Sequence, residues 1–143
     1  MSFNFKYVPV LRSRQQELLV LRSFDFEDRI FPMLEIIKEK DRINNNRAVQ
    51  DIWKDCVADI KAKRVFVDLP VYIRDRASMQ DEVVSFNRQT LSNLKKRITF
   101  FKIFSTLEKK VIPVVSSLLS KTGEQASIKN QVDALREFFP NIA

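Results

Sequence analysis

The stretch KYVPVLRSRQQELLVLRSF, residues 6–24, decides the fold, because a short apolar run passes at once into a helical pattern. Residues 7–11 form an apolar run that is too short for a helix, and this run predicts a buried strand. The apolar positions that follow recur close to helical spacing: Leu18, Leu19, Leu21 and Phe24. A strand followed by a helix of about three turns therefore opens the chain.

Three later apolar runs predict three more strands. They are IFPMLEII at 30–37, RVFVDLPVYI at 64–73 and KVIPVVSSLL at 110–119. The first strand, the 30–37 run and the 110–119 run share a proline within apolar sequence, which is unusual because proline has no N–H to donate to a sheet. We interpret these prolines as markers of strand starts, where a missing N–H is tolerated.

Helical periodicity fills the segments between the strands. It predicts helices over 47–63, 81–110 and 123–139, and the asparagine-rich residues 38–46 predict an exposed loop. Over 81–110 a long or broken helix is favoured, although RITFFKIF at 97–104 is also compatible with an extra strand.

Alternating strands and helices predict the fold class, an α/β domain with a parallel sheet and right-handed crossovers. No glycine-rich turn follows the first strand, which argues against a doubly wound nucleotide-binding sheet. Four consecutive β-α units instead resemble half of a TIM-type (β/α)8 barrel, and we expect one domain over 1–143. Half a barrel has open edges, so we expect a homo-oligomer or a complementary second-half chain.

The composition excludes several classes of site. The chain has no histidine, one glycine and one cysteine, and its formal net charge is +7. Histidine-based catalysis, most zinc sites and glycine-rich phosphate loops are excluded, and no cofactor or metal is expected. The single cysteine, Cys56, fits a reducing cytoplasmic compartment, and no apolar run is long enough to span a membrane.

The first two strands resemble a known family, the beta family proteins of phages and bacterial mobile elements. The matching residues are Tyr7, Pro9, Arg12, Glu17, Pro32, Leu34 and Glu35. Gln16 stands where the family usually has a glycine. The resemblance implies that this chain covers the N-terminal half of a longer protein with a role in host–phage conflict, and it implies no agreed catalytic residues.

Polar residues follow the carboxyl end of each expected strand, where parallel barrels keep their sites. Arg12, Glu35 and Asp68 form a candidate catalytic set, in which the carboxylates share acid–base work or bind magnesium. Arg12 and Arg14 can hold a phosphate group. The same rim holds three further polar residues: Lys38, Ser116 and Ser117. The structural alternative is that these residues make ion pairs and local hydrogen bonds.

A basic segment over 87–110 is the second candidate site. Its cations are Arg88, Lys95, Lys96, Arg97, Lys102, Lys109 and Lys110, against the single acid Glu108. Phe100, Phe101 and Phe104 interleave with them, as stacking residues do in single-strand binders. The alternative is a buried phenylalanine face and a solvated lysine face.

These features, together with the resemblance, predict a non-enzymatic interaction factor that binds a host or phage macromolecule through the basic segment, with nucleic acid as one candidate. The alternative function is an enzyme or enzyme remnant that acts on a phosphate-bearing substrate at the rim formed by Arg12, Glu35 and Asp68.

Overall fold

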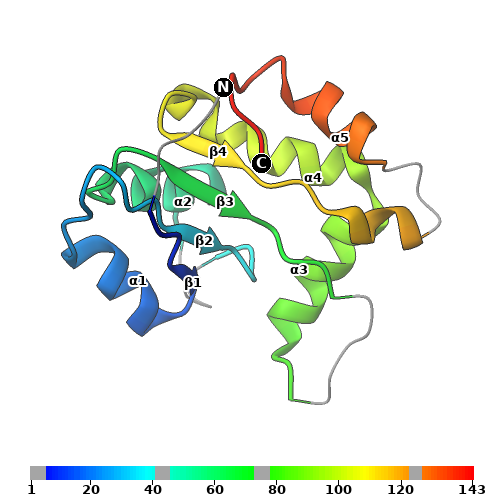
Figure 1. Ribbon diagram of the computed structural model, residues 1–143. Coiled ribbons are helices and arrows are strands. Elements are labelled where there is room, and N and C mark those ends of the chain that lie inside the picture. Colours follow the sequence, from blue (N-terminus) through cyan, green and yellow to red (C-terminus); the bar gives the residue numbers. More distant parts are fainter. Residues whose placement is uncertain (1–5, 41–45, 73–77, 123–126) are drawn as a thin grey trace.

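The computed structural model describes residues 6–40, 46–72, 78–122 and 127–143, in which strands and helices alternate (Figure 1). The elements run in the order β1 (Val10–Arg12), α1 (Gln15–Ser23), β2 (Met33–Glu35), α2 (Val49–Asp59), β3 (Val65–Asp68), α3 (Asp81–Ser92), α4 (Leu94–Phe101), η1 (Lys102–Leu107), β4 (Val111–Pro113), η2 (Ser117–Thr122) and α5 (Ile128–Leu135). The expected loop over 38–46 and the expected start of the last helix at 123 lie partly outside the described residues.

The four strands form one parallel sheet in the order β1-β2-β3-β4, so each strand pairs with its neighbour in sequence. The register aligns Leu11 with Leu34 and Leu34 with Val67, and this row faces the helices. Side chains alternate between the faces of a strand, so the residues on either side of this row point to the opposite face. The expected α/β class with a parallel sheet is confirmed.

The main core lies between the sheet and its helices. Leu21 of α1, Trp53 of α2 and Phe101 of α4 join Val65 and Val67 of β3 in one buried cluster. Each helix supplies apolar residues at a spacing that places them on one side, and burial of that side stabilises the helix. The helix expected over 47–63 is confirmed in its central part, since α2 spans Val49–Asp59.

The opposite face of the sheet holds a smaller apolar cluster. Phe31, Phe66 and Ile112 are buried there, and Met33 and Val114 pack against them. The rings of Phe31 and Phe66 lie with their centroids 6.4 Å apart. This face therefore has an apolar layer below the polar residues at the carboxyl ends of the strands.

Proline occupies two kinds of position in the sheet. Pro9 and Pro32 directly precede β1 and β2, and their carbonyls accept hydrogen bonds from Met33 N–H and Phe66 N–H. The interpretation as strand-start markers fits these two residues. It is wrong for Pro113, which is the last residue of β4. All three keep their carbonyl in the ladder, and at each position the sheet lacks the one hydrogen bond that an N–H would donate.

The segment 81–107 is a broken helix and contains no strand. Asn93 separates α3 from α4 with an extended backbone, and its side chain accepts a hydrogen bond from Lys96 N–H at 3.1 Å. That hydrogen bond caps the start of α4. The alternative strand at 97–104 is wrong, because these residues lie in α4 and η1 and bury their phenylalanines against α2 and the sheet.

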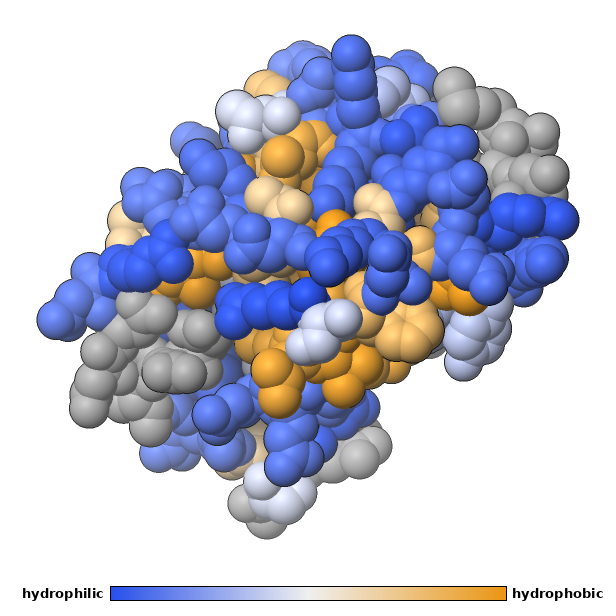
Figure 2. Space-filling model, turned by 90° about the vertical axis from the view of Figure 1, so that its left-hand side faces the viewer, coloured by the Kyte–Doolittle hydropathy of each residue, from blue (hydrophilic) through white to orange (hydrophobic). Residues whose placement is uncertain are grey.

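The two edges of the sheet differ. On β4, Ala143 N–H donates to Pro113 C=O and Ala143 C=O accepts from Val115 N–H, which is the pattern of a parallel bridge. On the β1 side several large apolar side chains are exposed: Tyr7, Val10, Leu19, Val20 and Phe24. Figure 2 looks onto this side and shows apolar areas between polar side chains. Self-association through the open edge stays a prediction.

None of the helices in the described part of the chain combines the length and the apolar character that a membrane crossing requires.

Candidate functional site

The sheet register brings together the three side chains that end the first three strands. Arg12 is aligned with Glu35, and Glu35 with Asp68, at the carboxyl ends of β1, β2 and β3. Because the neighbouring row Leu11, Leu34 and Val67 faces the helices, this row points to the opposite face of the sheet. The rim therefore carries a line of charged groups above the apolar layer.

An ion pair joins Arg12 to Glu35. Arg12 Nε lies 3.3 Å from Glu35 Oε2, and the two side chains are 46% and 20% exposed. The backbone N–H of Arg12 donates to the Glu17 carboxylate, which ties the start of α1 to the end of β1. A pair with this exposure contributes at most about 1 kcal/mol to stability, so its main effect is to orient the Arg12 guanidinium.

Asp68 faces a buried cation that comes from α4. Arg97 Nη2 lies 3.8 Å from Asp68 Oδ1, and the Arg97 side chain is 1% exposed. Its guanidinium also lies over the Phe101 ring, 5.6 Å from the centroid. Among the described residues, neither Arg97 Nη1 nor Nη2 has a hydrogen-bond partner. The guanidinium is thus held by charge and by the aromatic ring.

Burial shifts the protonation of both partners. Burial raises the pKa of Asp68 from 3.8 to about 6, against the lowering effect of Arg97 and with a further rise from Glu35. Burial also lowers the pKa of Arg97 to about 10, although Asp68 opposes this shift. Both pKa shifts disfavour the charged form. For each ion the unfavourable desolvation is therefore larger than the favourable attraction to its partner.

A pocket of about 590 Å³ opens beside this rim. Three cationic side chains line it, together with neutral residues: Arg12, Arg14, Lys38, Gln15, Ile37, Tyr72, Ser78, Met79, Gln80 and Val83. No carboxylate belongs to this lining within the described ranges. We call this hollow the rim pocket.

Tyr72 is held over the rim pocket by α3. Its N–H donates to Asn87 Oδ1 at 3.0 Å, and Asn87 Nδ2 donates back to its carbonyl at 2.7 Å. Burial raises the pKa of the Tyr72 hydroxyl, and the charges of Arg12, Glu35, Arg14 and Asp68 all act on it. Tyr72 is a rim residue that the sequence analysis missed, because only the tertiary structure places the segment after β3 beside Arg12, Arg14 and Lys38.

The fourth strand adds little to the rim. Ser116 Oγ accepts a hydrogen bond from Leu118 N–H at 3.2 Å, and its backbone is paired with the Gln131 amide at 3.0 and 2.8 Å. Ser116 therefore satisfies local groups, as the structural alternative predicted. Ser117 is the first residue of η2.

The structure divides the basic segment between surface and interior. Arg97 is buried, so its expected role as a surface contact is wrong. Lys110 Nζ donates to the carbonyls of Ala58 and Ile60 at 3.1 and 2.5 Å, where it caps the end of α2, and burial lowers its pKa. The other cations are exposed: Arg88, Lys95, Lys96, Lys102 and Lys109.

The phenylalanines of this segment are core residues. Phe100, Phe101 and Phe104 are 9%, 1% and 0% exposed, so the alternative of a buried phenylalanine face is confirmed and the stacking platform for nucleic-acid bases is wrong. Their spacing follows the helix, and the side that they share faces the sheet. Lys102 Nζ lies 4.6 Å above the Phe138 ring beside α5.

No group of three or more metal-ligating side chains occurs in the described part of the chain. Glu35 and Asp68 are a pair of carboxylates that are held by arginines on either side.

The fold and the rim define a class of protein: an α/β protein with a sequentially ordered parallel sheet and a charged rim at the carboxyl ends of its strands. A family model described as Beta protein matches residues 7–143, and the chain belongs to this family. Neither the curated proteins nor the solved structures contain a significant match.

Proposed function

We propose that this protein is a non-enzymatic binding factor that holds an anionic group of its partner, a phosphate or a carboxylate, in the rim pocket. The observation that carries the proposal is the convergence of Arg12, Arg14 and Lys38 on one pocket with no carboxylate in its described lining. Three cations at one concave site attract an anion from solution and bind it by charge-assisted hydrogen bonds.

The geometry of Arg12 supports this assignment. Glu35 contacts the Nε side of the Arg12 guanidinium and so holds the side chain across the rim. An arginine that is already oriented loses less conformational freedom when it binds a planar or tetrahedral anion. Two buried residues, Ile36 and Ile37, connect Lys38 to the end of β2, so the backbone of Lys38 is anchored as well.

Removal of the two arginines tests the proposal. We expect the double variant Arg12→Ala, Arg14→Ala to bind pyrophosphate at least about tenfold more weakly, because each charge-assisted hydrogen bond contributes roughly 1.5–3 kcal/mol. Titration of the ¹⁵N-labelled protein with pyrophosphate at low salt measures the binding, and chemical-shift changes should cluster at the rim. Binding should weaken as salt is raised.

Arg136→Ala is the matched control, because it removes an exposed cation from the end of α5. Its pyrophosphate affinity should equal that of the wild type. If the wild type shows no saturable shifts, or if the double variant binds as the wild type does, the rim pocket is not an anion site.

A second candidate function, an enzyme that acts on a phosphate-bearing substrate, is favoured by Asp68 alone. Its pKa of about 6, beside Glu35 and Arg97, suits a carboxyl that exchanges protons near neutral pH. We expect hydrolysis of p-nitrophenyl phosphate to fall roughly 100-fold in Asp68→Asn, with Asp133→Asn as the control on α5. Circular dichroism verifies the fold of each variant. No turnover by the wild type above buffer would remove this candidate.

The architecture that we propose for the sheet is half of a (β/α)8 barrel. The sequential parallel order supports it, and so does the small apolar layer on the face that is opposite the helices. The bridge of Ala143 to β4 lies where a fifth strand of such a barrel pairs. The rim row then occupies the position in which barrels keep their binding sites.

A further inference from the structure

The rim pocket continues into two further hollows. Lys38 lines both the rim pocket and a middle hollow of about 370 Å³. Glu39, Phe86 and Gln89 in turn line both the middle hollow and a far hollow of about 450 Å³. Consecutive hollows share lining residues, so they adjoin one another in a row that leads from the ends of the strands to α4, and we call this row the groove.

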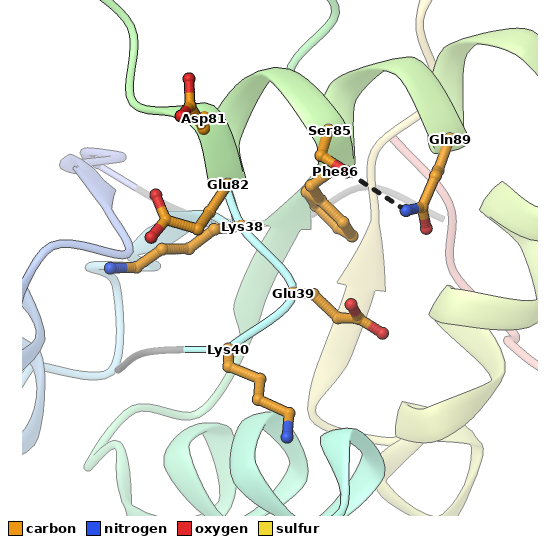
Figure 3. Close-up of a pocket in the computed structure, with 8 residues that line it drawn as sticks. All are labelled: Lys38, Glu39, Lys40, Asp81, Glu82, Ser85, Phe86 and Gln89. Carbon is orange, nitrogen blue, oxygen red and sulfur yellow. Dashed lines mark hydrogen bonds between the residues drawn. The ribbon is translucent and has the colours of Figure 1, made fainter. Parts of the chain in front are cut away.

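Two walls of different origin bound the groove. Figure 3 shows Lys38, Glu39 and Lys40, which follow β2, across the middle hollow from α3. On the α3 side, Asp81 and Glu82 lie at the first turn, whereas Ser85, Phe86 and Gln89 lie further along the helix. The far hollow lies among α2, α3 and α4: it is lined by Val49, Gln50, Asn93, Lys95, Lys96, Thr99, Phe100 and Ile103, among others.

The charges along the groove change sign in order. The rim end carries Arg12 and Arg14, with Lys38 at the junction. The middle carries three carboxylates, those of Glu39, Asp81 and Glu82, against two cations, Lys38 and Lys40, so its described lining is net negative. The far end carries Lys95 and Lys96 against Glu39, so its described lining is net positive, above a floor that includes Val49, Phe100 and Ile103.

We infer that this groove is a docking site for an extended peptide segment of a partner protein. The segment that fits has an acidic residue at the rim end, a basic residue in the middle, and an apolar residue followed by an acidic residue at the far end. This charge order complements the order of the groove, and complementarity of this kind selects partner and orientation. The rim end of the inference rests on the proposed function.

The groove favours a peptide over a nucleic acid. A phosphate backbone that runs from Arg12 to Lys95 passes the carboxylates of Asp81 and Glu82, which repel it. Phe86 and Phe100 are 6% and 9% exposed, so they offer apolar edges for a side chain and no open ring face for a base. The exposed amides of Gln50 and Gln89 can bond the backbone of an extended peptide.

Selection from a random library of short peptides displayed on yeast tests the inference. We expect the wild-type protein to enrich peptides that combine an acidic end, a central Lys or Arg, and an apolar–acidic end. A selected peptide should bind Lys95→Glu, Lys96→Glu about tenfold more weakly, and selection with this variant should replace the second acidic position by Lys or Arg.

Lys61→Glu, Lys63→Glu is the matched control, because it makes the same charge change at exposed residues between α2 and β3. It should bind the selected peptide as the wild type does. Three outcomes would overturn the inference. The library yields no enrichment over an unrelated protein, the Lys95→Glu, Lys96→Glu variant binds the peptide as the wild type does, or oligo-dT displaces the peptide from the far end.

A third variant separates this inference from the proposed function. In Arg12→Ala, Arg14→Ala only the first acidic position should lose its enrichment. If pyrophosphate does not bind the wild type, and the wild type does not enrich an acidic residue at the first peptide position, the rim proposal fails. If pyrophosphate binds at the rim but the far-end variants leave peptide binding unchanged, the docking groove alone is wrong.

Discussion

Replacement of Arg97 by methionine is expected to lower the free energy of unfolding by about 3 kcal/mol at pH 7. Methionine fills a similar volume beside Phe101, so the loss comes mainly from Asp68, which remains inside without its cation. Arg97 lowers the pKa of Asp68 more than the backbone hydrogen bond from Leu69 does, so its removal raises that pKa above about 6. Urea unfolding followed by circular dichroism measures the change.

The loss of stability in Arg97→Met is expected to depend on pH. The folded state binds the Asp68 proton more tightly than the unfolded chain, because the pKa rises from 3.8 to about 6 on folding. The contribution of this group to stability is therefore largest at low pH and falls as pH rises from about 4 to about 6. In Arg97→Met the pKa is higher, so protonation at pH 5 removes the unpaired charge and the loss of stability is smaller there than at pH 7.

The double variant Asp68→Asn, Arg97→Met provides the decisive comparison. It removes both ions, so no buried charge remains to be desolvated on folding. The double variant should therefore recover most of the stability that Arg97→Met loses. A double variant as unstable as the single one, or a loss in Arg97→Met that is the same at pH 5 and pH 7, would contradict this account of the pair.

Replacement of Trp53 by alanine is expected to lower the free energy of unfolding by about 4 kcal/mol. Trp53 is 0% exposed and lies in the main core between α2 and the sheet. Truncation leaves a large cavity that the surrounding helices cannot close. Urea unfolding must be followed by circular dichroism, since Trp53 is the only tryptophan.

Trp53→Phe separates packing from hydrogen bonding. The indole Nε1 donates to Glu39 C=O at 2.6 Å, and this bond ties the segment after β2 to α2. Phenylalanine keeps most of the apolar contact but leaves that carbonyl without its donor, so we expect a loss of about 1 kcal/mol. The variant should also bind pyrophosphate severalfold more weakly, because Lys38 precedes Glu39. If Trp53→Phe and Trp53→Ala lower the free energy of unfolding equally, apolar packing is not the main contribution of Trp53 to stability.

Local pattern is enough to predict much of the fold. The apolar runs around Val10, Leu34, Val67 and Ile112 were long enough to predict strands, and their alternation with helices predicted the parallel sheet. The strand bounds were too wide, since β1, β2 and β4 are three residues each. Apolar residues continue past each strand because the flanking turns are buried too, and pattern alone does not separate a buried turn from a strand.

The site was predictable only where the sheet itself aligns residues. Arg12, Glu35 and Asp68 each follow a strand, so sequence position was sufficient to predict one rim. The charged neighbours Lys95 and Lys96 predict a surface position for Arg97 as well, and the structure buries it. The helical period puts Arg97 on the same side as Phe101, four residues later, and that side is buried.

By itself, the sequence determined the order of strands and helices, the charge of the rim and the absence of histidine chemistry, because these follow from residue type and spacing along the chain. The tertiary structure decided which charges meet. Arg97 reaches Asp68, Tyr72 lines one pocket with Arg12, and three hollows adjoin one another only after α3 and α4 pack beside the sheet. Contacts between residues far apart in sequence depend on how whole elements pack, and no local pattern carries that information.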